Sequence, residues 1–224
     1  KVLTRGEELR FGLVLFGRAV EYLPYFIFTF SELGAAGLGR ERGSCVLEDV
    51  VRVGLRGETA VVYSAADRKV REGDHRLPLE ELLSTPPRRP LSLRFQTPTR
   101  IKTDGKLVPR PDFPAVVKAL VHRTIGLAET HAELRIGLDV PAMLAEAAQV
   151  ESAPVDIRWL DWERYSSRQD ARMTFGGFIG RAIYDGPMET TAPLVVLGQY
   201  THIGKNTTFG LGKYEIASRP KAII

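Results

Sequence analysis

An α+β protein with antiparallel sheets is the fold class that the sequence predicts. The first observation is the order of segments in residues 91–224, where β-prone stretches and stretches of helical spacing alternate as strand, helix, strand, strand, helix, strand. The second is an internal similarity between residues 11–20 and 175–183, since each is predicted as an apolar strand that enters a Gly-Arg-Ala turn. The order of elements is that of the ferredoxin-like fold, in which helices cover one face of an antiparallel sheet.

Each element of the second domain has its own signal. Apolar residues at helical spacing predict a helix over residues 113–131, and Asp112 stands before it as a cap. Pro193 falls in the first turn of the last predicted helix, where proline is favoured. The other elements are expected as strands over 91–101, 154–164, 172–184 and 214–216, and as helices near 142–149 and over 191–200.

The first domain is predicted to be incomplete. Residues 9–16 and 45–53 suggest strands and residues 25–33 a helix, which together make only the second half of a ferredoxin-like domain. We therefore assign residues 1–90 to that half domain and a proline-rich linker, and residues 91–224 to a complete domain. On this interpretation, the natural protein carries a further strand–helix–strand unit in front of this sequence.

Composition limits the classes of partner and cofactor. The sequence has 31 Lys and Arg against 27 Asp and Glu, a net charge of +4, which favours an anionic partner only where the charges cluster. Cys45 is the single cysteine and the four histidines lack metal-ligand spacing, so we expect neither a metal nor another cofactor. The longest apolar run, residues 22–30, is too short to cross a membrane, and no signal peptide is visible. We therefore expect a cytoplasmic protein.

Basic residues gather in the segment that opens the second domain. They are either a solvated connector or part of an anion-binding surface, and Asp104 is the one acid among them. The basic residues are Arg88, Arg89, Arg94, Arg100, Lys102, Lys106 and Arg110.

The strongest functional signal is a glycine-rich segment near the end of the chain. Glycine permits left-handed backbone and close approach to a ligand, so that backbone amides are expected to point into a concave loop, and lysine adds positive charge. The segment therefore predicts phosphate binding. A nucleotide-triphosphate P-loop does not fit, because Gln199 stands where that motif needs its first glycine and Asn206 where it needs Ser or Thr. The residues expected to contact phosphate are Gly204, Lys205, Gly210, Gly212 and Lys213.

The glycine-rich segment also carries a family resemblance. Residues 202–216 are similar to the C-terminal signature of the precursor-crRNA-processing endoribonuclease of the RAMP superfamily of CRISPR-associated proteins. Weaker similarities at residues 16–19, 97–100 and 164–169 extend the resemblance over nearly the whole chain. The fold that this family implies is a tandem of ferredoxin-like domains.

The resemblance implies a protein that binds CRISPR repeat RNA and cuts the precursor transcript once in each repeat. Family members cut without metal, since the ribose 2′-hydroxyl attacks the neighbouring phosphate and leaves a 2′,3′-cyclic phosphate and a 5′-hydroxyl. The family often supplies a histidine with a tyrosine or lysine from an early helix of the first domain, a part that this sequence lacks. Other CRISPR-associated proteins are further expected partners.

Two other functions compete with this one. A non-catalytic RAMP subunit that holds crRNA in an effector complex would use the same glycine loops and basic faces. A ferredoxin-like ligand-binding or regulatory domain would have no affinity for RNA.

The remaining candidate residues each have a functional and a structural interpretation. His202 is the best catalytic candidate, because imidazole titrates near neutrality, but it could equally pack against or cap the preceding helix. Two groups of residues remain. The first group, in the first domain, either contacts a second phosphate or ends a helix. The second group, around a polar hairpin tip, either braces an RNA stem or is solvated. The first group is Gly37, Gly39, Arg40 and Arg42, and the second is Arg164, Arg168 and Arg172.

Overall fold

Two compact units make up the chain in the computed structural model. The first consists of Lys1–Arg52 and Thr59–His75 and the second of Val53–Glu58 and Arg76–Ile224, and we describe each by itself. The structure describes residues 4–39, 41–55, 57–84, 86–161, 163–166 and 171–217.

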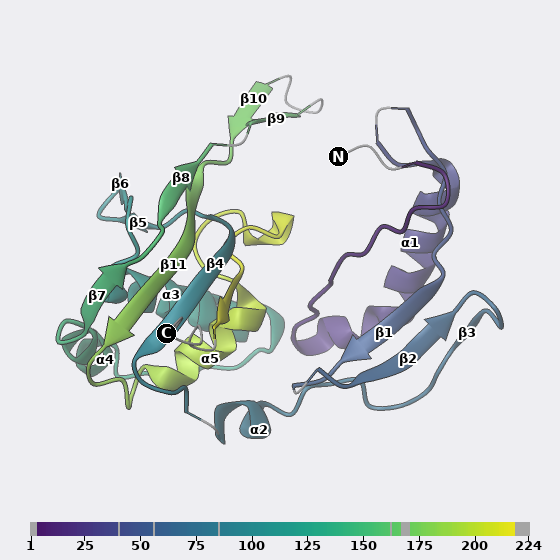
Figure 1. The fold of residues 1–224 in the computed structure, drawn as a ribbon. Helices are drawn as coiled ribbons and strands as arrows, with labels where there is room; N and C mark the ends of the chain where they lie inside the picture. Colours follow the sequence, from purple (N-terminus) through teal and green to yellow (C-terminus); the bar gives the residue numbers. More distant parts are fainter. Residues whose placement is uncertain are drawn as a thin grey trace, which may run out of the picture. The chain divides into compact units, whose positions relative to one another are not determined.

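The first unit holds one long helix and a small sheet (Figure 1). The helix α1 (Leu23–Ala36) follows the 3-10 helix η1 (Gly17–Tyr22). The sheet joins three strands in the order of the sequence, β1 (Asp49–Val53), β2 (Thr59–Ser64) and β3 (Lys69–Val70).

The strand predicted over residues 9–16 is wrong. Within the described chain, residues 7–16 form neither helix nor strand. The physical reason is that a strand needs a neighbour for its backbone N–H and C=O groups, and no described strand pairs with this segment. The next strand does form but is shorter than predicted, since it begins at Asp49 instead of residue 45.

The second unit is built on a five-stranded sheet (Figure 1). Its strands lie in the order β12–β4–β11–β7, every pair is antiparallel, and β8 also pairs with β11. This is the strand order of a ferredoxin-like fold, and the predicted α+β class with an antiparallel sheet is confirmed. The strands are β4 (Leu91–Thr99), β7 (Glu151–Pro154), β8 (Arg158–Leu160), β11 (Gly177–Asp185) and β12 (Tyr214–Ile216).

Aspartate side chains cap the starts of two helices, and the first of these caps, Asp112, was predicted from the sequence. The carboxylate of Asp112 accepts a hydrogen bond from the Ala115 amide at 3.4 Å, and Asp139 does the same for Ala142 at 3.0 Å, so each satisfies an amide that its helix leaves open. The helix predicted over 113–131 has those bounds in the structure. The helices of the second unit are α2 (Leu79–Ser84), α3 (Phe113–His131), α4 (Val140–Ala147) and α5 (Ala192–Thr201).

One hydrophobic core joins α3, α4 and α5 to a single face of this sheet. At its centre the ring of Phe95 meets Phe178 edge-on at 5.0 Å and Tyr214 at 5.9 Å between centroids. Aromatic pairs of this geometry add to the stability gained from burial. The Tyr214 hydroxyl is buried too and donates to the Val195 carbonyl at 2.6 Å, which ties β12 to α5.

A carboxylate fixes α4 to the start of α5. Glu146 accepts hydrogen bonds from the Thr190 amide at 3.0 Å, the Thr191 amide at 3.1 Å and the Thr191 hydroxyl at 2.8 Å. Partial burial raises the pKa of Glu146, but these hydrogen bonds outweigh it and hold the pKa below its ordinary value. The negative charge also suits the positive end of the α5 dipole.

The Gly-Arg-Ala similarity does not correspond to one repeated structure. At the first place the predicted turn forms, since the Ala19 amide donates to the Phe16 carbonyl at 3.1 Å at the start of η1. At the second place it is wrong, because Gly180-Arg181-Ala182 lies inside β11. The long strands predicted over 154–164 and 172–184 are each divided, because residues near positions 161 and 175 leave the sheet. Their distal parts form a hairpin of β9 (Glu163–Ser166) and β10 (Ala171–Thr174).

Short elements complete the unit. The hairpin of β5 (Lys102–Thr103) and β6 (Lys106–Leu107) follows β4, and the 3-10 helix η2 (Thr207–Phe209) lies between α5 and β12. Among the helices that the structure describes, none is both long and apolar enough to cross a bilayer.

We predict that Gly198→Ala destabilises the second unit. A Cβ at this buried helix position would overlap the Tyr214 hydroxyl and a methyl group of Leu120, and such overpacking costs about 1–3 kcal/mol. Urea unfolding followed by circular dichroism measures the change. Gly126→Ala in α3 is the matched control, because open space surrounds that position and the better helix former should stabilise by up to about 1 kcal/mol. Equal effects of the two substitutions would contradict this packing.

Candidate nucleic-acid interface

The glycine-rich loop between α5 and β12 is held against the end of β4. The Lys205 amide donates to the Arg100 carbonyl at 2.9 Å and the Gly212 amide to the Pro98 carbonyl at 3.1 Å. The Lys213 amide donates to the Thr97 hydroxyl at 2.9 Å. The loop is also closed on itself, since the Ile203 amide donates to the Gly212 carbonyl at 3.0 Å.

Two of the glycines are required for this close approach. A Cβ at Gly204 would collide with the Arg100 carbonyl, and one at Gly212 with the Ile203 carbonyl. Both residues also have positive φ, at +81° and +73°, which L side chains rarely adopt. Gly210 has φ +77° but open space around it, so only its backbone conformation calls for glycine.

The amides of the loop are used differently from the prediction. The sequence suggested a cradle of free N–H groups, yet the protein's own acceptors take six of them: those of Ile203, Lys205, Phe209, Gly210, Gly212 and Lys213. The glycines therefore let backbone pack on backbone, and these six amides are not free to bind phosphate. What the loop offers to a ligand is the pair of exposed lysine side chains, Lys205 and Lys213.

His202 occupies the junction of α5 and the loop. Its backbone has φ +58°, unusual for a residue with a side chain, and its amide donates to the Gly198 carbonyl at 2.9 Å. Burial lowers the pKa of His202 below 6.5, a hydrogen bond with the Leu211 backbone partly offsets this, and the charges of Lys213 and Arg123 lower it further. The ring is thus held mainly neutral at pH 7 beside two cations.

Arg123 is the residue that the sequence analysis missed. It comes from α3, its Nε donates to the Thr201 carbonyl at 2.9 Å, and burial lowers its pKa. The signal was present, since Arg123 stands three and seven residues after the buried Leu120 and Val116, on the core-facing side of the helix. A guanidinium group that is partly buried needs a hydrogen-bond acceptor, and here the acceptor is the Thr201 carbonyl in the last turn of α5.

The other predicted residues that the structure describes lie in the β9–β10 hairpin and in the first unit. Arg164 lies in β9 and Arg172 in β10, so the predicted hairpin forms. The rings of Phe175, just after β10, and Phe209 in η2 meet at 5.4 Å, which joins the base of this hairpin to the glycine loop. In the first unit, Gly37 ends α1 and Gly39 follows it, and Arg42 is exposed with φ +50°. Arg40 and Arg168 lie outside the described residues.

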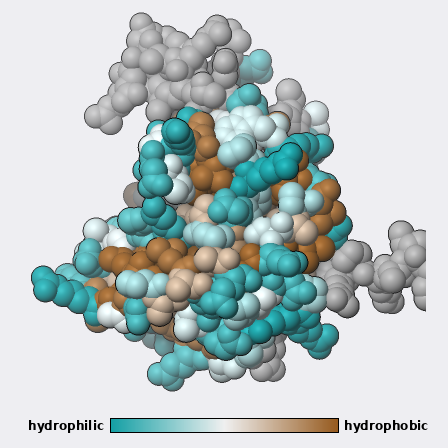
Figure 2. Space-filling model, turned by 90° about the vertical axis from the view of Figure 1, so that its left-hand side faces the viewer, coloured by the Kyte–Doolittle hydropathy of each residue, from teal (hydrophilic) through white to brown (hydrophobic). Residues whose placement is uncertain are grey.

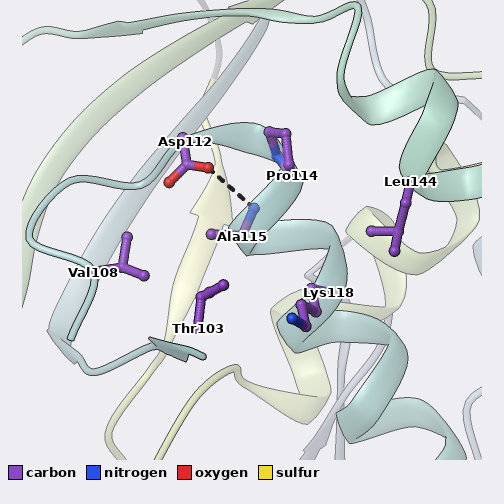
Figure 3. Close-up of a pocket in the computed structure, with 7 residues that line it drawn as sticks. All are labelled: Thr103, Val108, Asp112, Pro114, Ala115, Lys118 and Leu144. Atoms are coloured by element: carbon purple, nitrogen blue, oxygen red, sulfur yellow. Dashed lines mark hydrogen bonds between the residues drawn. The ribbon is translucent and has the colours of Figure 1, made fainter. Parts of the chain in front are cut away.

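A separate pocket of about 340 Å³ opens near the start of α3 (Figure 3). Val108, Pro114 and Leu144 supply apolar walls, and Figure 2 shows a band of hydrophobic residues on the side of the molecule that carries β7 and α4. The charges at the pocket are engaged within the protein: Lys118 pairs with Asp104 at 3.3 Å, and Asp112 caps the helix. The pocket therefore lacks the unpaired cations found at the loop. In the described part of the chain, no group of three His, Cys, Asp or Glu is placed to hold a metal ion.

Comparison with known proteins gives one family for the second unit. A family model described as the CRISPR-associated endoribonuclease Cas6 matches residues 93–214, more than half of the 224 residues. Another model, described as an N-terminal domain, matches residues 1–75. No match was found among curated proteins.

Solved structures of Cas6 proteins are also similar to the chain. A Cas6 product complex is 25% identical with a TM-score of 0.44, covering 62% of this chain and 56% of that one. A second product complex is 21% identical with a TM-score of 0.47, covering 62% and 55%. Thermus thermophilus Cas6 is 18% identical with a TM-score of 0.47, covering 70% and 64%. The chain thus spans less than two thirds of the length of each of these structures.

We predict that the ring of His202 titrates below 6.5 and that Lys213→Gln raises its pKa, because one of the two repelling cations is removed. Lys205→Gln is the matched control and should leave the pKa of His202 unchanged. Histidine ring resonances followed by NMR against pH measure both, and equal shifts in the two variants would contradict the arrangement.

Since the unfolded chain binds the proton of His202 more tightly than the folded chain does, the free energy of unfolding should rise with pH between the folded-state pKa and 6.5. His202→Gln should remove that part of the rise.

Proposed function

The chain belongs to the family of the CRISPR-associated endoribonuclease Cas6, and from this membership we propose that it binds CRISPR repeat RNA and takes part in processing the precursor transcript. The matched region, residues 93–214, contains the whole sheet except the outer ends of two strands, together with the glycine loop. Other CRISPR-associated proteins are proposed as further partners.

The observation that carries this proposal is the group of cations at the glycine loop. Lys205 and Lys213 are exposed, and Arg123 is half-buried beside the end of α5. The charges of Lys213 and Arg123 both act on His202 and lower its pKa. Lysine and arginine side chains on a rigid backbone suit the negatively charged sugar-phosphate chain. We propose that Gly204, Gly210 and Gly212 shape this loop and that its lysines contact phosphate.

Further contacts are proposed along the hairpin and in the first unit. Arg164 of β9 and Arg172 of β10, with Arg168 between them in the sequence, are proposed to brace an RNA stem through its backbone. The base of this hairpin adjoins the loop through Phe175 and Phe209. Arg40 and Arg42, after α1, are proposed as a second phosphate contact.

The proposed chemistry is transfer of the phosphoryl group within the RNA strand, without a metal. A base removes the proton of the 2′-hydroxyl, the 2′-oxygen attacks the adjacent phosphorus, and the 5′-oxygen leaves with a proton from an acid. A mainly neutral His202 can accept the first proton, and the charges of Lys213 and Arg123 can stabilise the crowded phosphorane. The family resemblance places a further histidine with a tyrosine or lysine on an early helix of the first domain.

Binding to a CRISPR repeat hairpin should weaken when both loop lysines are removed. If Lys205 and Lys213 each neutralise one phosphate, the double alanine variant should lower the slope of log K against log salt by about 1.5. Fluorescence anisotropy at several salt concentrations measures this slope. Lys118→Ala is the control, because its ammonium is paired with Asp104. Unchanged affinity and slope in the double variant would remove the loop from the RNA interface.

Cleavage should persist in excess chelator and leave a 2′,3′-cyclic phosphate. The test uses labelled repeat RNA, and phosphatase and polynucleotide kinase treatment of the products identifies the end groups. His202→Gln should lower the cleavage rate at least about tenfold if the ring is the base. RNA binding without any cleavage would favour the non-catalytic RAMP subunit instead, and loss of cleavage in chelator would contradict the metal-independent route.

A further inference from the structure

The helix-free face of the second sheet brings together two arginines that the sequence left unexplained. Arg94 belongs to the basic segment that opens the second domain, and Arg181 to the Gly-Arg-Ala similarity. The register of β4 and β11 sets them directly opposite each other. The neighbours Leu93, Phe95 and Ala182 face the helices in the core, so both arginines point to the other face.

This pairing is only partly compensated within the protein. Like charges directly opposite on one face of an antiparallel pair are destabilising, since their Cβ atoms are about 5 Å apart. Within the described chain, neither guanidinium makes an ion pair or hydrogen bond. Glu215 of β12 stands opposite Arg94, and its carboxylate accepts from the Gln96 side chain at 2.6 Å. With one carboxylate and two guanidinium groups, the row Glu215–Arg94–Arg181 keeps an excess of positive charge.

A register shift between β4 and β11 adjoins Arg181. It falls between the pairs Phe178–Thr99 and Gly180–Phe95, so the extra residues lie in β4, and Gly180 of β11 has φ +117°. A Cβ there would collide with the Asp156 carbonyl, while the Asp156 carboxylate accepts from the Arg181 amide at 2.5 Å. Bulges of this kind redirect a side chain and are features of functional edges and sites.

A third arginine lies on the same face. Arg158 of β8 is exposed and stands opposite Ile179, which is two residues before Arg181 and points to the same side. The described positions on this face carry no aromatic side chain on which a base could stack. They are Ser92, Arg94, Gln96, Arg158, Ile179, Arg181, Ile183 and Glu215.

We propose that Arg94 and Arg181, with Arg158 beside them, bind the sugar-phosphate backbone of an RNA strand across the helix-free face of the sheet. This inference rests on the proposed function, because it assigns a second contact surface to the same RNA. Guanidinium groups bind phosphate through two parallel hydrogen bonds. With cations and no stacking platform, the face contacts phosphates and does not read bases.

The test is the Arg94→Gln/Arg181→Gln double variant of the chain, titrated with labelled CRISPR repeat RNA between about 50 and 200 mM salt. The dissociation constant should rise about tenfold at low salt and the slope of log K against log salt should fall by about 1.5. The Arg94→Lys/Arg181→Lys variant should keep most of the slope. Because a repelling pair is removed, the thermal unfolding midpoint of the glutamine variant should stay the same or rise.

Arg89→Gln is the matched control, since Arg89 is an exposed arginine paired with Glu189. An unchanged slope in the double variant, while the Lys205 and Lys213 variant still weakens binding, would overturn the sheet-face site and leave the proposed function intact. Absence of RNA binding by the unmodified chain would overturn both. A lower unfolding midpoint in the glutamine variant would show instead that the pair has a structural role.

Discussion

The contact between the glycine-rich loop and the end of β4 is the constraint on which the candidate site depends. Backbone meets backbone there, through the Lys205 amide on Arg100 and the Gly212 amide on Pro98. Such contacts need glycine, because a side chain at position 204 or 212 would strike a carbonyl. The position of each nearby side chain follows from them: Lys213 enters β12 at a fixed register, and His202 is drawn into a backbone conformation that few residues adopt.

A rigid loop changes how the cations at the site should be understood. Arg123 donates to a carbonyl at the end of α5, where the helix dipole is negative and a positive charge is favourable. Lys213 has no such compensation in the described chain, and both charges act against protonation of His202. An anion bound beside these groups would be attracted by both positive charges and would raise the pKa of His202. The electrostatics therefore favour phosphate even though most of the loop amides are already occupied.

Local signals predicted the second unit well. The bounds of α3 follow from Asp112 and the apolar spacing behind it, and the order of strands gave the topology of the sheet. The strand expected over 9–16 failed because an apolar run does not reveal whether a partner strand exists. The second Gly-Arg-Ala was expected to form a turn, yet it lies within β11, where Gly180 has positive φ beside a shift of register against β4.

The candidate site was harder to predict than the fold, for a related reason. Spacing identifies which residues lie on a loop, but three of the loop amides, those of Lys205, Gly212 and Lys213, donate to residues 97–100, more than a hundred positions earlier. Arg123 and Thr201 are separated by 78 positions. Both contacts arise only when β4 and α3 pack beside the last helix and strand, so neither has a local signature.

One strand links the two proposed RNA surfaces. Arg94 lies within β4 and Arg100 directly follows its end, where it receives the Lys205 amide. Six residues of extended chain cover about 20 Å, which equals the length of about six nucleotides of a stacked strand. Contacts at both ends of that length would fix the direction and register of the RNA through its phosphates, while its sequence would have to be read elsewhere. If both surfaces bind RNA as proposed, β4 would set the distance between the two contacts, and the cleaved bond would depend on which phosphate this distance places beside His202.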